Sequence, residues 1–343
     1  MLLTFYRFIN NKSVFAGMMA QSKIAIIAII IIIPLVSVIL WSNESTKNLE
    51  ASEDELQVYV SFYPLYETTQ AVIGQKADVK ILTPTNVDPH DFDPSVKVIQ
   101  EMKTADLIIL NGGGFESWIS NMEFESGQLL DSSNGISFLK TESVVHHEIT
   151  EEEHEEHEEH EENEEHEEHQ VVSDPHIWLN PNLVKIQVKN IAERLSEIDP
   201  ENSKSYNENA LQYIEKLELL DLQIREELSS CSKKDFITFH NAFSYFSDEY
   251  GLTPHTIAKG VHDHSATPTA KSIEDVIDLA KELNLSVIFA EDTSDIRISQ
   301  VIADEIGADV LILSPVATED IENKNYFERM QQNASNLKKA LCN

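Results

Sequence analysis

Apolar and polar positions over residues 57–122 alternate between short apolar runs and segments with helical spacing. The apolar runs predict strands over residues 57–62, 78–82 and 106–110. The other segments predict helices over residues 64–73, 94–104 and 115–122. Strands that alternate with helices are typical of βαβ units, so this region predicts an α/β lobe with a parallel sheet.

The same alternation returns over residues 235–341. Short apolar runs predict strands over residues 235–239, 253–257, 286–290 and 309–313. Segments with helical spacing predict helices over residues 242–250, 268–283, 296–306 and 325–341. The chain therefore contains a second predicted α/β lobe.

A helical region separates the two lobes. Residues 182–197 have apolar positions at helical spacing, and residues 201–229 continue without glycine or proline. The apolar face of this second helix comprises Tyr206, Leu211, Ile214, Leu217, Leu220 and Ile224. At 1.5 Å per residue the helix would be roughly 40 Å long. We predict two α/β lobes with parallel sheets, residues 57–199 and 230–343, joined by one long rigid helix over residues 200–229. Parallel sheets bind ligands at the carboxyl ends of their strands, so a ligand is expected in the cleft between the lobes.

The N-terminal region predicts a membrane anchor. Residues 24–41 carry no charge and are nearly as long as the roughly 20 residues of a spanning helix. Arg7, Lys12 and Lys23 precede this segment, which places the N-terminus in the cytoplasm and the rest of the chain outside. We predict an anchor within residues 1–42 and a polar tether over residues 43–56. A cleaved signal peptide is the alternative.

The strong negative charge of the chain argues against a nucleic-acid partner and points to metal ions. The formal net charge is -35, and phosphate contacts need Lys and Arg, so the chain is not expected to bind nucleic acid. Part of the acidity lies in a His/Glu-rich loop over residues 146–170, and the rest is spread over the chain. Its histidines, seven of the thirteen in the chain, are His146, His147, His154, His157, His160, His166 and His169. A tract of this composition predicts a disordered segment that binds several metal ions weakly. A solvated spacer is the alternative.

Three further histidines lie at predicted strand ends. His90 stands in a proline-rich loop after a strand, His176 stands in DPHIWLNP, and His240 follows the strand FITF directly. Three imidazole ligands are the number expected for a bound zinc ion with one position left. The sequence thus predicts a metal site in the cleft.

The chain has two cysteines, Cys231 and Cys342. Cys231 ends the long helix and Cys342 ends the last predicted helix. Because the chain is predicted to lie outside the cytoplasm, where disulfides persist, we expect the two to pair. Two unpaired small apolar residues are the alternative.

At this point the sequence resembles a known family. The stretches DPHDFDPS, NGGGFESWI, DPHIWLNP, FITFHNAFSYFSDEYGL and VIFAEDTSD resemble the metal receptors of ABC importers, the surface solute-binding proteins for zinc and manganese. The resemblance extends from Gln57 to the C-terminus. It implies two α/β lobes bridged by a long helix, with the metal between the lobes, an ABC permease as partner, and a monomer on the membrane.

The resemblance also implies the ligands. His90, His176 and His240 match the family's metal-binding histidines, and Asp295 is the expected fourth ligand, with Glu291 or a water molecule as alternatives. His262 and His264 are expected to be peripheral. Manganese-selective relatives tend to carry Glu in place of His240, and nitrogen ligands favour zinc over manganese, so Zn²⁺ is the expected ion.

Other functions remain as alternatives at this stage. A manganese receptor would share the fold, and three histidines with a bound water also suit an extracellular zinc hydrolase. The chain contains no HExxH, GxSxG or P-loop motif, so we expect a protein that is not an enzyme. An adhesion protein with an incidental zinc site is a further alternative.

Overall fold

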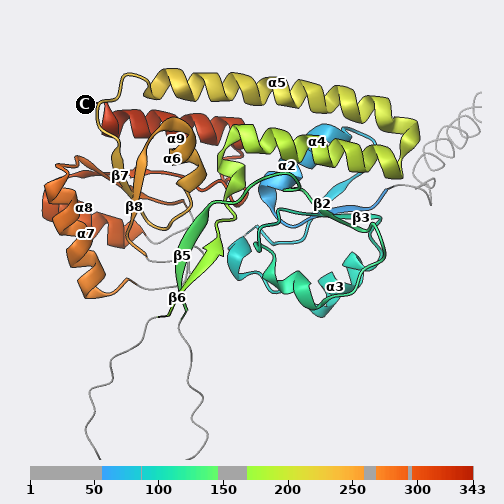
Figure 1. Ribbon diagram of the computed structural model, residues 1–343, viewed down its shortest axis with the longest axis horizontal. Coiled ribbons are helices and arrows are strands. Elements are labelled where there is room, and N and C mark those ends of the chain that lie inside the picture. Colours follow the sequence, from blue (N-terminus) through green and yellow to red (C-terminus); the bar gives the residue numbers. More distant parts are fainter. Residues whose placement is uncertain (1–55, 86, 146–167, 259–267, 293–295, 343) are drawn as a thin grey trace, which may run out of the picture. The chain divides into compact units, whose positions relative to one another are not determined.

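The first sheet has four parallel strands in the order β2-β1-β3-β4 (Figure 1). The structure is a computed structural model and describes residues 56–85, 87–145, 168–258, 268–292 and 296–342. The strands are β1 (Val58–Val60), β2 (Val79–Ile81), β3 (Leu107–Leu110) and β4 (Leu129–Asp131). All residues of β1 and β3 are buried, as expected for central strands of a parallel sheet covered on both faces.

The helices of this half begin and end at recognisable signals. They are α2 (Tyr63–Ile73), α3 (Val96–Met102) and α4 (Pro181–Ile198), with short 3₁₀ turns η1 (Pro89–Asp91), η2 (Ser117–Asn121) and η3 (Ile177–Leu179). α2 has a proline in its first turn and ends at Gly74, whose φ of 66° favours glycine. The side chain of Asn180 caps α4 by accepting a hydrogen bond from the Asn182 N–H.

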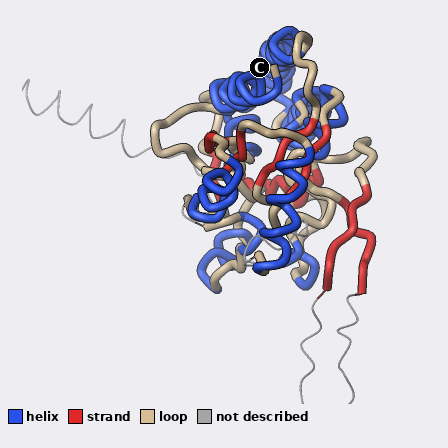
Figure 2. The backbone as a smooth tube through the Cα atoms, turned by 90° about the vertical axis from the view of Figure 1, so that its left-hand side faces the viewer, coloured by secondary structure: helices blue, strands red, loops and turns tan. Residues whose placement is uncertain are grey.

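An antiparallel hairpin joins β4 to α4. It consists of β5 (Lys140–Val145) and β6 (Glu168–Ser173), and its outermost pair is Val145 with Glu168. Figure 2 shows these two strands at the lower right of the view. Residues 168–170 were predicted as part of the His/Glu-rich loop, but pairing with β5 places them in β6. Residues 146–167 lie outside the described residues.

The long helix is α5 (Ser203–Leu228), preceded by the 3₁₀ turn η4 (Pro200–Asn202). It contacts α2 and α4 from the first half and α9 (Tyr326–Leu341) from the second (Figure 1). Its 26 residues give a length of about 39 Å at 1.5 Å per residue. Leu211 was predicted on the apolar face but is 62% exposed, because the helix turns it away from these contacts.

The second half also contains parallel strands. β7 (Asp235–Thr238) pairs with β8 (Thr253–Thr256), β9 (Val287–Ala290) pairs with β10 (Asp309–Ile312), and β7 packs beside β9. The remaining helices are α6 (Ser244–Tyr250), α7 (Ala270–Glu282) and α8 (Ile296–Ile306). Two α/β halves with parallel strands and one long helix across both confirm the predicted fold class.

One apolar core connects the two halves. It includes Val60 and Leu107 of the first sheet, Leu217 of α5, and Phe236 and Phe289 of the second half. Residues 56–343 form one compact unit. This continuous core holds the strand ends of both halves in fixed positions.

Two predictions about the ends of the chain have different outcomes. Cys231 and Cys342 form a disulfide, as predicted, which ties the end of α9 to the segment between α5 and β7. The apolar segment over residues 24–41 lies outside the described residues. Within residues 56–342, apart from the gaps given above, no helix is both long and apolar enough to cross a membrane.

Candidate metal centre

His90 reaches the cleft from the loop after β2. It lies in the 3₁₀ turn η1, which Asp88 caps by accepting the His90 N–H at 3.0 Å. Burial raises the pKa of Asp88, although the hydrogen bond from His90 opposes that shift. The ring of Phe115 packs edge-on against the imidazole, with 4.7 Å between centroids. Capping and aromatic packing together fix where this imidazole lies.

Glu116 holds the backbone beside Phe115. Its buried carboxylate accepts hydrogen bonds from Ser61 Oγ at 2.6 Å and from the Asn111 N–H at 2.7 Å. Because Ser61 follows β1 and Asn111 follows β3, the carboxylate ties two strand ends together. Burial raises the pKa of Glu116 to about 7, and these hydrogen bonds oppose the shift.

His176 reaches the cleft just after the hairpin. Asp174, fully buried, accepts both the His176 N–H at 3.0 Å and a hydrogen bond from His176 Nδ1 at 2.8 Å. Burial alone would raise the pKa of Asp174, but the positive charge that the His176 ring carries when protonated, together with its hydrogen bonds, outweighs burial and lowers the pKa. The Asp-Pro-His triplet is the same as at Asp88–His90, and both aspartates accept the histidine N–H.

His240 follows β7 in the second half of the chain. The carboxylate of Glu291, which follows the neighbouring strand β9, lies 2.7 Å from His240 Nδ1 and accepts the His240 N–H at 2.9 Å. The His240 and Glu291 residues are 1% and 3% exposed. A buried carboxylate therefore lies behind this imidazole, as Asp174 does behind His176.

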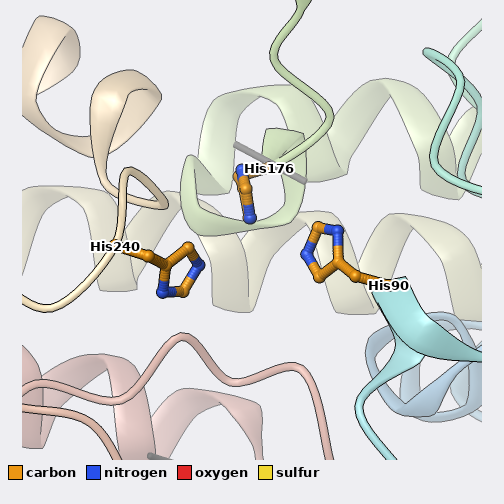
Figure 3. A group of neighbouring side chains, drawn as sticks. All are labelled: His90, His176 and His240. Atoms are coloured by element: carbon orange, nitrogen blue, oxygen red, sulfur yellow. The ribbon is translucent and has the colours of Figure 1, made fainter. Parts of the chain in front are cut away.

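The three imidazoles face one another across the cleft (Figure 3). One nitrogen from each ring lies within 4.8 Å of the others. A tetrahedral zinc ion with nitrogen ligands at about 2.0–2.1 Å needs those nitrogens about 3.3 Å apart. The three nitrogens thus lie farther apart than in such a complex, and a small inward movement of the rings would bring them to the spacing that zinc needs.

The walls of the site come from both halves of the chain. Besides the histidines, the pocket is lined by Asp88, Pro89, Trp178, Pro315, Ala317 and Thr318. The indole of Trp178 donates a hydrogen bond to the Pro315 carbonyl at 2.8 Å, and the hydroxyl of Tyr326 donates to the Trp178 carbonyl at 2.8 Å. These two hydrogen bonds hold Pro315 and Tyr326 of the second half against Trp178, which stands two residues after His176.

The other predicted site residues have different positions. Glu291 lies behind His240 and is not among the residues that line the pocket. Asp295, His262 and His264 lie outside the described residues. Of the loop histidines, His169 lies in β6 opposite Val144, and the other six lie outside the described residues.

The carboxylates that lie behind the imidazoles were not predicted from the sequence as partners of those rings. For Asp174 a signal was present, because Asp-Pro-His occurs twice in the chain at histidines predicted as ligands. For Glu291 no local signal exists, because 51 residues separate it from His240.

Comparison with known proteins gives consistent matches. The profile of the family described as zinc-uptake complex component A, periplasmic (ZnuA), matches residues 58–340. The high-affinity zinc uptake system protein ZnuA of Bacillus subtilis is 37% identical over 308 residues, 87% of this chain and 92% of that protein. The zinc-binding protein AdcA of Streptococcus pyogenes is 31% identical over 320 residues, 90% of this chain but 61% of its own length.

Solved structures agree with the sequence matches. The crystal structure of the metal-dependent lipoprotein YcdH from Bacillus subtilis is 32% identical, with a TM-score of 0.68. The match covers 84% of this chain and 100% of that one. Nearly the whole described fold is therefore shared.

Proposed function

The chain belongs to the family of the periplasmic zinc-uptake complex component A, and on that premise we propose that His90, His176 and His240 hold the Zn²⁺ ion. Membership makes the chain an extracytoplasmic zinc-binding component of an ABC importer and not an enzyme. The observation that carries the proposed ligand set is the convergence of three ring nitrogens within 4.8 Å.

The chemistry of the site suits zinc. Imidazole nitrogen is a preferred ligand of Zn²⁺, whereas manganese favours carboxylate, carbonyl and water oxygens. No carboxylate is among the three converging residues. The proposed ligand set therefore favours zinc over the manganese alternative. Copper binds such ligands more strongly, so selectivity against copper in the cell must come partly from its availability.

The fourth coordination position has two candidates. Both oxygens of Glu291 lie 2.7 Å from His240 Nδ1. This contact holds the carboxylate behind the ring, on the side away from the pocket. Asp295 and a water molecule therefore remain as proposals. Asp295→Ala would remove an oxygen ligand in the first case and leave the coordination unchanged in the second.

A growth experiment tests the function. Deletion of the gene should slow growth in zinc-depleted medium, and added zinc should restore it, because the importer loses the receptor that captures zinc at low concentration. The variant with all three cleft histidines replaced by alanine should behave like the deletion. Normal growth of the deletion strain with defective attachment to surfaces would instead support the adhesion alternative.

We propose that the His/Glu-rich loop is a second, weaker zinc binder. Removal of residues 147–166 leaves both strands of the hairpin whole, so the cleft should keep its structure. Calorimetric titration should show one tight zinc site in the shortened protein and additional weak sites only in the parent. Loss of the tight site on deletion would show that the two sites are not separate.

We also propose that residues 24–41 anchor the chain, as a monomer, in the membrane. A relative named as a lipoprotein points to membrane attachment in the family. The first cysteine of this chain is Cys231, so an apolar helix and not a lipid on an N-terminal cysteine would be the anchor. Fractionation of membranes distinguishes this anchor from a cleaved signal peptide, which would release the protein.

A further inference from the structure

Two of the three cleft imidazoles have a buried carboxylate directly behind them. Asp174 accepts a hydrogen bond from His176 Nδ1 at 2.8 Å, and both oxygens of Glu291 lie 2.7 Å from His240 Nδ1. All four residues are at most 3% exposed. A carboxylate in its ionised form only accepts hydrogen bonds, so it favours the tautomer in which Nδ1 of the facing ring carries the proton.

This proton position decides which atom can bind the ion. A neutral imidazole has one protonated nitrogen and one that can bind metal. With Nδ1 protonated, Nε2 on the opposite edge of each ring is the ligand atom. Each carboxylate thus selects the tautomer and the orientation that the cleft requires.

The carboxylates also bear on the charge of the site. Three neutral imidazoles bring no charge, whereas a zinc ion brings two positive charges into a buried cleft. A buried ion without a compensating charge is strongly disfavoured. Asp174 and Glu291 place carboxylates directly behind two of the rings, and Asp88 also lines the pocket, so acidic groups surround the position of the ion.

We propose that Asp174 and Glu291 are positioning residues that make Nε2 of His176 and His240 the ligand atoms and supply negative charge that favours a divalent ion. The proposal rests on the proposed zinc site. It predicts that the cleft discriminates between ions by charge as well as by ligand type.

The test uses substitutions that keep the shape of each carboxylate. Glu291→Gln retains an acceptor for the His240 N–H but removes the negative charge. Loss of such a partner costs roughly 10- to 100-fold in metal affinity, so zinc binding should weaken by that factor. Asp174→Asn should have an effect of similar size, and it carries the test alone if Glu291→Gln does not fold.

A matched control exists on β7, the strand that precedes His240. Asp235 begins β7, and its carboxylate lies 2.9 Å from His255 Nε2. It stands five positions before His240, which corresponds to about 16 Å at about 3.3 Å per strand residue. Asp235→Asn removes a carboxylate from a histidine outside the cleft. Zinc affinity of this variant should equal that of the parent protein.

The decisive comparison uses two ions of different charge. Affinities for Zn²⁺ and for Cu⁺ are measured by chelator competition on residues 56–343 with the loop shortened as above. Removal of one negative charge should weaken binding of the divalent ion more than binding of the monovalent one. Equal losses for both ions, or unchanged zinc affinity, would overturn the proposal. Failure of the parent protein to bind zinc would instead overturn the proposed function itself.

Discussion

His176→Ala should reduce zinc affinity by roughly 60- to 700-fold. Zinc sites of four ligands bind with about 10–16 kcal/mol, so one ligand accounts for about 2.5–4 kcal/mol. Every 1.4 kcal/mol is about tenfold in affinity. His176 is fully buried and lies between the other two rings, with centroid distances of 5.0 Å to His90 and 5.4 Å to His240. The cavity left by the ring cannot supply a replacement nitrogen.

His255→Ala is the matched control for this loss. His255 is a histidine of the same half of the chain as His240, but it binds Asp235 and not the cleft. Calorimetric titration of both variants, with the loop shortened, measures the tight site alone. Full affinity in His176→Ala would remove this residue from the ligand set, and a matching loss in His255→Ala would show that the effect is not specific to the cleft.

Removal of the disulfide should lower the free energy of unfolding by up to about 4.7 kcal/mol, the chain-entropy value for a loop of about 100 residues. The sequence separation of Cys231 and Cys342 is 111 residues. Without the bond, the end of α9 is held by packing against α5 and by the hydrogen bond from the Lys233 N–H to the Leu341 carbonyl. Denaturant unfolding of Cys231→Ser measures the loss.

Single and double replacements should have the same effect, because either one breaks the bond. Ser232→Ala, which changes an exposed residue next to Cys231 and leaves both cysteines in place, is the control. Thiol labelling of the denatured, unreduced parent protein should find no reactive cysteine. Two reactive thiols would contradict both the disulfide and the extracytoplasmic location from which it was predicted.

Regular elements of the fold could be predicted because they carry strong local signals. α8 occupies the predicted residues 296–306, and the buried strand β3 follows from its uninterrupted apolar residues. β4 and the hairpin strands could not be predicted in this way. β4 depends on pairing with β3, and β5 and β6 depend on pairing with each other, and not on a pattern within any of these strands.

In the candidate site, too, features with a local sequence signal could be predicted and tertiary contacts could not. His90, His176 and His240 could be predicted, because each follows a strand or a proline-rich loop and parallel strands bring such ends together. Their convergence depends on the shared core, which the sequence does not display. The pairing of His240 with Glu291 is a tertiary contact between neighbouring strand ends, so Glu291 could only be proposed as a ligand.

X-ray absorption at the zinc edge tests the central claim most directly. The sample is the one-to-one zinc complex of residues 56–343 with the loop shortened, so that only the cleft contributes. We predict three imidazole nitrogens at about 2.0–2.1 Å from the ion. Loss of one imidazole shell in His90→Ala, His176→Ala or His240→Ala would assign each ligand. A coordination shell of oxygen atoms without imidazole, or no retained zinc, would contradict the assignment of these three histidines as the zinc site.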